Sequence, residues 1–158
     1  MKFKSIRVRA VAVAGIAFAL ATASLIAVYL PQTVTLAREP YKRVEKLLAT
    51  DTTILDQPIA YPAAEPSRVT AVIVTLRPGE ETGWHTHAVP LFGYIMEGEL
   101  TVDYGKRGKK VYKSGDSVVE AMNTPHNGTS SGTGPVRIMA VFMGAQGVAN
   151  TTMIDVRK

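Results

Sequence analysis

From residue 51 onward, apolar and polar residues alternate with a period of two in a series of short segments. Glycine and proline separate these segments at close and even intervals, and no helical pattern lies between them. Such spacing is typical of a β-sandwich or barrel. The sequence therefore predicts a mainly β domain with strands at 53–55, 68–76, 83–87, 91–97, 99–104, 109–113, 117–121, 126–129 and 136–143.

The N-terminal segment has a different pattern. Four basic residues precede residue 10, and residues 10–30 then contain no charge. A basic start followed by an apolar run addresses a chain to a membrane. A retained helix of this length would span roughly 30 Å, whereas a signal peptide would be cleaved after Ala23. The apolar run continues past Ala23, which favours an anchor in the inner membrane with the domain in the periplasm or outside. Secretion to the periplasm after cleavage is the alternative.

The sequence divides into three parts. Residues 1–36 form the signal or transmembrane segment with its connector, and residues 37–50 are expected to contain a short amphipathic helix. The helix is predicted from about residue 40 to residue 49, because Tyr41, Val44, Leu47 and Leu48 recur at helical spacing. Residues 51–158 form the β domain, whose size suits one domain.

Charge and cysteine content exclude several classes of function. Four of the 18 Lys and Arg residues lie before residue 10, and the remaining 14 nearly balance the 13 Asp and Glu residues. The domain therefore has no basic stripe that would follow nucleic-acid phosphates. The sequence has no cysteine, which excludes disulfides, thiolate metal sites and a catalytic thiol.

The histidines are the candidate chemistry. The chain has only three, His85, His87 and His126. In an extended strand, residues two apart point to the same face, so His85 and His87 would present two imidazoles side by side. A neutral imidazole is the commonest protein ligand for a transition metal. Surface His-x-His pairs are also common. Here, however, all three histidines lie in β segments bounded by glycine, which strengthens the metal-binding hypothesis.

The spacing around these histidines resembles the two sequence motifs of the cupin superfamily. In the first motif five residues separate a Gly from His-x-His, and a second Gly closes the hairpin; Gly79 and Gly98 are in register. In the second motif a Gly begins a turn that leads to the third His, as Gly115 and His126 do. The chain resembles a small single-domain (type 2) cupin of the bacterial quercetin-dioxygenase-like kind. The resemblance implies a double-stranded β-helix, or jelly-roll barrel, and a homodimer, since cupins are often dimers.

The sequence departs from the cupin motifs at four positions. Leu91 occupies the place of the usual ligand Glu, which reduces the expected ligand set to His85, His87 and His126. Ala121, Asn123 and Ser130 replace the Pro, Gly and Asn of the second motif. Asn tolerates the left-handed backbone conformation that a Gly would adopt, so the turn is expected to survive.

Three neutral imidazoles would leave a divalent metal with its full charge and with open positions. Such a site favours an anionic oxygen ligand, for example an enolate or a hydroxy-ketone. Iron(II) is the preferred ion, with nickel, manganese, copper and zinc as alternatives. A replacement carboxylate could come from Glu81, Glu97 or Glu120, but each lies at or beside a predicted turn and is expected to face solvent.

Apolar side chains near the histidines are candidates for a pocket over the metal. Ordinary barrel core is an equally supported interpretation of them, because ligand pockets are themselves mostly apolar. The candidates are Trp84, Leu91, Phe92, Tyr94, Met122 and Phe142.

Two functions from different classes follow. The first is a metal-dependent dioxygenase that acts on a small oxygenated organic molecule. The second is a non-catalytic, membrane-tethered module that binds or senses a metal or small ligand. No residue stands out as a general base, which agrees with a metal-centred reaction. The fold hosts many functions, so the resemblance alone does not choose between them.

Overall fold

The structure is a computed structural model that describes residues 43–64 and 66–155. The expected transmembrane or signal segment lies outside these residues and stays a prediction. Within the residues described, no helix is long and apolar enough to cross a membrane.

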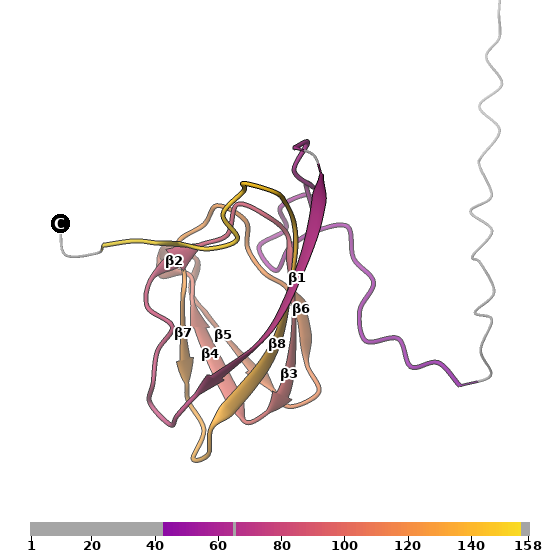
Figure 1. The fold of residues 1–158 in the computed structure, drawn as a ribbon. Helices are drawn as coiled ribbons and strands as arrows, with labels where there is room; N and C mark the ends of the chain where they lie inside the picture. The colour runs from indigo at the N-terminus through magenta and orange to yellow at the C-terminus, as the bar shows by residue number, and fades with distance from the viewer. Residues whose placement is uncertain (1–42, 65, 156–158) are drawn as a thin grey trace, which may run out of the picture. The chain divides into compact units, whose positions relative to one another are not determined.

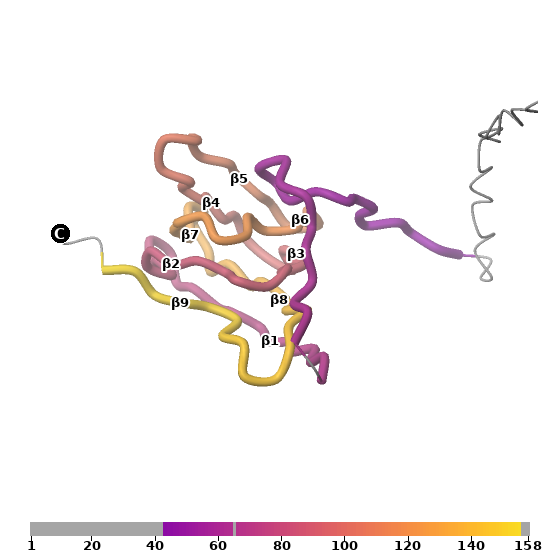
Figure 2. The backbone as a smooth tube through the Cα atoms, turned by 90° about the horizontal axis from the view of Figure 1, so that it is seen from above, coloured from indigo at the N-terminus to yellow at the C-terminus, as the bar shows by residue number. Residues whose placement is uncertain are grey.

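The domain is built from antiparallel sheets, which confirms the mainly β expectation (Figure 1). A four-stranded sheet has the order β1-β8-β3-β6, a three-stranded sheet has the order β5-β4-β7, and β2 pairs with β9. Figure 2 shows the two larger sheets on opposite sides of the domain, with the C-terminal segment running beside β2. The elements are β1 (Ser67–Leu76), β2 (His85–Thr86), β3 (Leu91–Glu97), β4 (Glu99–Asp103), the 3-10 helix η1 (Gly105–Arg107), β5 (Lys109–Lys113), β6 (Ser117–Val119), β7 (Asn127–Ser130), β8 (Val136–Ala145) and β9 (Thr152–Met153).

Most of the predicted strands are present. The bounds of β3 and β5 agree with the prediction, and β1, β4, β6, β7 and β8 differ from it by one or two residues at an end. The segment predicted as 83–87 is reduced to β2. The weak strand predicted at 53–55 is wrong, because these residues belong to a turn in which Asp56 N–H donates to Thr53 O at 3.0 Å.

The short amphipathic helix is also wrong over the part that the structure describes. Residues 43–50 contain no helix, and Val44, Leu47 and Leu48 are exposed. Leu47 O instead accepts a hydrogen bond from Ser117 Oγ at 2.8 Å. A helix of about ten residues is marginal in water unless its apolar face packs against another element. The predicted apolar face has no such packing, so helical spacing alone did not produce a helix.

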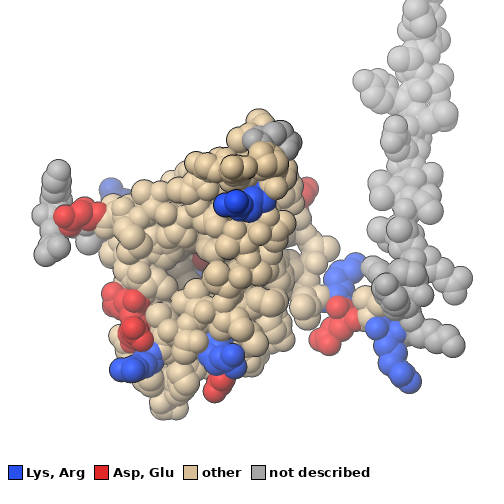
Figure 3. Space-filling model, in the orientation of Figure 1, with Lys and Arg blue, Asp and Glu red and all other residues tan. Residues whose placement is uncertain are grey.

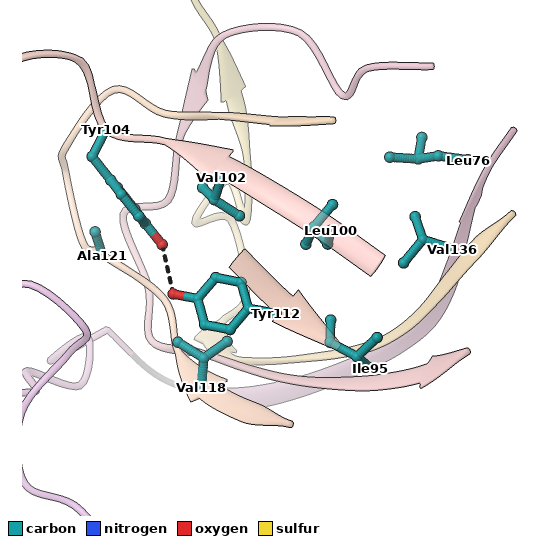
Figure 4. Close-up of a cluster of buried hydrophobic side chains, with 9 residues drawn as sticks. All are labelled: Leu76, Ile95, Leu100, Val102, Tyr104, Tyr112, Val118, Ala121 and Val136. Carbon is teal, nitrogen blue, oxygen red and sulfur yellow. Dashed lines mark hydrogen bonds between the residues drawn. The ribbon is translucent and has the colours of Figure 1, made fainter. Parts of the chain in front are cut away.

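The core lies between the two larger sheets. Alternate residues of each strand point inward, as the period of two requires; in β3 the buried residues are Leu91, Gly93 and Ile95. Figure 4 shows one inward-facing cluster, in which two tyrosine hydroxyls meet among aliphatic side chains. This cluster consists of Leu76, Ile95, Leu100, Val102, Tyr104, Tyr112, Val118, Ala121 and Val136, and a second one consists of Val89, Leu91, Ala140 and Phe142.

Candidate metal centre

Backbone pairing brings the two histidine-bearing segments together. His85 N–H donates to His126 O, and His126 N–H donates to His85 O, both at 3.0 Å. Two residues after His85, His87 O accepts a hydrogen bond from Asn123 N–H at 2.8 Å. Asn123 adopts a φ of 49°, so it occupies the left-handed conformation expected of the residue that replaces the motif glycine. The turn before His126 therefore forms with asparagine in place of glycine.

The three imidazoles face one another. Their ring centroids are 4.4 Å apart for His85 and His126, 4.8 Å for His85 and His87, and 5.0 Å for His87 and His126. One nitrogen from each ring lies within 4.8 Å of the others. All three residues are buried. The structure thus groups the three histidines that the sequence singled out, and their binding of a metal stays a prediction.

The other nitrogen of each ring is held by a fixed oxygen. His85 Nδ1 lies 2.7 Å from Gly83 O, and His126 Nδ1 lies 2.8 Å from Thr124 O. His87 Nδ1 lies 3.0 Å from Asn150 O, in the segment that leads to β9. Because a carbonyl only accepts, each Nδ1 carries the proton and each Nε2 keeps its lone pair. Such contacts fix the tautomer and ring orientation of metal-ligating histidines.

The surroundings keep the imidazoles neutral. Burial lowers the pKa of all three histidines, because a charged ring loses its hydration there. For His87 burial lowers the pKa to about 4. Metal ligation requires neutral imidazole, so tautomer, charge and convergence all fit a divalent transition metal.

The histidine pKa shifts predict acid sensitivity of the metal-free domain. The pKa of His87 is 6.5 when unfolded and about 4 when folded, so the unfolded state binds the proton first as the pH falls. The free energy of unfolding is therefore expected to fall between pH 6.5 and pH 4, by about 3 kcal/mol from His87 alone. Urea unfolding of the apo-protein at a series of pH values measures this.

The control for that series is His87→Gln, which removes the titrating ring. Burial raises the pKa of Glu120, which acts in the opposite direction, so the difference between the two proteins isolates the histidine. Parallel pH profiles for wild type and His87→Gln would contradict the prediction.

The family model of the cupin domain matches residues 72–142. These residues are a cupin domain. The match begins in the middle of β1, ends within β8 and includes all three histidines. A comparison with curated proteins found no match.

Several solved structures resemble the cupin domain. Oxalate decarboxylase from Lactobacillus farciminis, in a formate complex, is 20% identical over 54% of this chain and 26% of its own, with a TM-score of 0.48. DMSP lyase DddQ from Ruegeria pomeroyi is 19% identical over 57% of this chain and 45% of its own, with a TM-score of 0.49. Oxalate decarboxylase from Bacillus subtilis, which has Mn(II) centres, is 19% identical over 54% and 24%, with a TM-score of 0.46. This chain therefore spans less than half the length of each.

A cavity of about 380 Å³ lies beside the imidazoles, and Figure 3 shows a hollow on one face with acidic atoms in its depth. This volume is at the small end of the range for ligand pockets, roughly 300–1,000 Å³. Leu91 and Phe142 line the cavity, as expected. Phe142 also packs edge-on against His87, with ring centroids 5.4 Å apart.

The other four pocket candidates do not line this cavity, and their role in ligand binding stays a prediction. Phe92 and Tyr94 alternate with the inward-facing residues of β3 and do not line the cavity. Trp84 precedes the inward-facing His85, so its side chain lies on the opposite face. The backbone oxygen of Trp84 accepts a hydrogen bond from Ile154 N–H at 2.9 Å. Met122 is buried but also lies outside the cavity lining.

The expectation for the carboxylates holds for two residues and fails for one. Glu81 and Glu97 are exposed, although Glu81 reaches the rim of the cavity. Glu120 is buried, with 7% of its surface exposed, and it lines the cavity. The strand predicted at 117–121 places Glu120 on the same face as Val118, and that face points inward. Its position beside a turn therefore did not make it solvent-facing.

The hydrogen-bonded group around Glu120 was not predicted from the sequence. Tyr104 OH donates to Glu120 Oε1 at 2.8 Å. It also lies 3.2 Å from Tyr112 OH (Figure 4). Burial raises the pKa of both tyrosines, in the case of Tyr112 to about 12, so both phenols are neutral. Alternation gave a partial signal, since it put Glu120 on the face of Val118. The three residues come from separate strands or turns, however, so only the fold could join them.

Proposed function

We propose that this cupin binds one divalent transition metal through His85, His87 and His126 and uses it in a dioxygenase reaction on a small oxygenated organic molecule. One observation carries the proposal. The three imidazoles lie together while each Nδ1 is tied to a fixed oxygen, which leaves the three Nε2 lone pairs free to bind a metal. The three neutral imidazoles would bind the metal, and the cavity beside them would hold a ligand of that metal.

The residues around the triad suit this chemistry. When bound, the metal would supply a Lewis-acid and redox centre for a chelating oxygen ligand and dioxygen. Leu91 stands where a carboxylate ligand would reduce the charge of that centre. Leu91, Ala140 and Phe142 give the cavity an apolar wall beside the imidazoles. The protein's contribution is to hold the ligand close to the three imidazoles in a largely apolar cavity.

Iron(II) is the ion that we propose for the reaction. A purely imidazole donor set suits iron, nickel, copper and zinc better than it suits magnesium or calcium. Zinc has no redox chemistry, so a zinc-loaded protein would retain ligand binding without oxygen chemistry. This difference supplies a matched control for the test of the reaction.

The proposed reaction predicts oxygen uptake. The iron(II)-loaded full chain is expected to consume dioxygen with at least one of acetylacetone, quercetin and catechol. His126→Ala is expected to lower that uptake by more than about 100-fold, because it removes one of three metal ligands. An oxygen electrode measures both, with the zinc-loaded protein as the inactive control. No uptake with any of the three compounds would overturn the dioxygenase proposal in favour of a non-catalytic binding module.

A further inference from the structure

A buried carboxyl group lies beside Leu91, directly after the neighbouring strand. Glu120 follows β6, and its backbone N–H donates to Leu91 O at 2.9 Å. The position where the cupin motif usually has a ligand carboxylate is thus apolar, while the neighbouring strand carries a carboxylate into the same cavity. Glu120 does not belong to the group of side chains close enough to share a metal with the histidines. Its position calls for a different role.

The two oxygens of Glu120 have different surroundings. Oε1 accepts hydrogen bonds from Ala121 N–H at 2.6 Å and from Tyr104 OH at 2.8 Å. Within residues 43–64 and 66–155, no hydrogen bond reaches Oε2. Every fully buried side-chain nitrogen or oxygen in that part of the chain has a hydrogen-bond partner. Oε2 is therefore accessible, and the cavity that Glu120 lines is where it is reached.

Tyr104 links this carboxyl group to the metal centre. Its hydroxyl holds Glu120, and its ring centroid lies 5.8 Å from that of His126. Tyr112 OH lies 3.2 Å from Tyr104 OH and extends the same network. The Glu120 carboxyl group is held by a backbone N–H and a buried phenol. Its other oxygen, Oε2, therefore has a fixed position in the cavity that the imidazoles line.

An accessible carboxyl oxygen loses its contact with water when a ligand fills the cavity, and a ligand that supplies a hydrogen bond replaces that contact. Most of the cavity wall is apolar, so Oε2 stands out as a point of orientation. A hydroxyl group satisfies this oxygen whether the carboxyl is charged or neutral, because a hydroxyl both donates and accepts.

We propose that Glu120 is the polar recognition group of the cavity, and that its ligand is a small, largely apolar molecule with a chelating oxygen pair at one end and a separate hydroxyl that hydrogen-bonds Glu120 Oε2. The chelating end rests on the metal-binding function proposed above. The hydroxyl end is new and depends on Glu120. Tyr104 is a positioning residue for this contact, since it holds Oε1.

The test compares two hydroxy-pyrones that differ only in the separate hydroxyl. Allomaltol has a methyl group where kojic acid has a hydroxymethyl group, and both chelate a metal through the same oxygen pair. Titration calorimetry measures their binding to the full chain, loaded with zinc and kept in detergent. Wild type is expected to bind kojic acid about fivefold or more tightly than allomaltol, the effect of one additional hydrogen bond.

Three variants localise that preference. Glu120→Leu is expected to bind both pyrones equally while its affinity for allomaltol stays within about twofold of wild type. Glu120→Gln keeps an acceptor for Ala121 and Tyr104, so it is expected to fold and to retain part of the preference. Glu97→Leu changes an exposed glutamate outside the cavity and is expected to behave as wild type.

An infrared measurement covers the case in which Glu120→Leu does not fold. The carboxyl band that disappears in Glu120→Gln is expected to shift when wild type binds kojic acid, and not when it binds allomaltol. An unchanged band with both compounds would overturn the inference.

The outcomes separate this inference from the proposed function. Equal binding of the two pyrones to wild type, or a preference that survives in Glu120→Leu, overturns the role of Glu120 and leaves metal chelation intact. Loss of zinc from Glu120→Leu would identify Glu120 as a metal ligand and would also overturn its role as the recognition group. Wild type that holds zinc but binds neither pyrone refutes the chelating function, and the inference with it.

Discussion

Replacing His87 by alanine is expected to abolish metal binding. The change removes one of three Nε2 ligands and leaves a pair, which lowers affinity by more than about 100-fold, since loss of an outer contact alone costs about 10- to 100-fold. Elemental analysis of the purified chain is expected to give about one transition metal per wild-type chain and almost none in His87→Ala.

Thr86→Ala is the matched control for this substitution. Thr86 lies between the two histidines of the first motif, and its side chain points away from their shared face. It is expected to keep the metal. Full metal retention in His87→Ala would refute the assignment of the site, whereas loss in both variants would point to a damaged β2.

Replacing Gly98 by alanine is expected to destabilise the domain by about 3 kcal/mol or more. Gly98 forms the turn between β3 and β4 with a φ of 80°. Residues that carry a side chain rarely adopt this backbone conformation. A Cβ here would collide with Pro135 O and lie 2.9 Å from Val136 Cα, both backbone atoms that cannot move aside cheaply. Thermal unfolding followed by circular dichroism is expected to show a Tm lower by more than about 10 °C.

Two glycines separate the causes of this loss. Gly105 also has a positive φ, 62°, but a Cβ would meet nothing within 4 Å, so Gly105→Ala is expected to cost about 1 kcal/mol from backbone strain alone. A Cβ at Gly134 would likewise meet nothing within 4 Å, and its φ lies outside the strained range, so Gly134→Ala is expected to be neutral. An equal loss in Gly98→Ala and Gly105→Ala would show that the collision contributes nothing.

Local pattern was sufficient for most of the strands. β3 and β5 agree with the predicted bounds because proline or glycine lies at or beside each end, Pro90 and Gly98 for β3 and Gly108 and Gly115 for β5. The motif spacing also located the three histidines, since residues two apart on a strand share a face whatever surrounds them. Asn123 behaved as its residue type predicts, because the left-handed conformation is a local property of the backbone.

Features that depend on packing were not predictable in this way. The helix expected at 40–49 needed a surface on which to bury its apolar face, and Val44 and Leu47 have none in the described part of the chain. β9 was missed because a strand of two residues has no period, and it forms only by pairing with β2. Both outcomes depend on segments far away in the sequence.

The sequence by itself determined that this protein has a β domain with a cupin motif and three histidines in register. Only the tertiary structure decided which face of each strand is the interior, and that choice removed Phe92 and Tyr94 from the pocket and put Glu120 into it. The tertiary structure also supplied Asn150 O as the partner of His87 and Tyr104 as the partner of Glu120. The physical reason is that alternation fixes which residues share a face, whereas burial is fixed by the other strands that close over it.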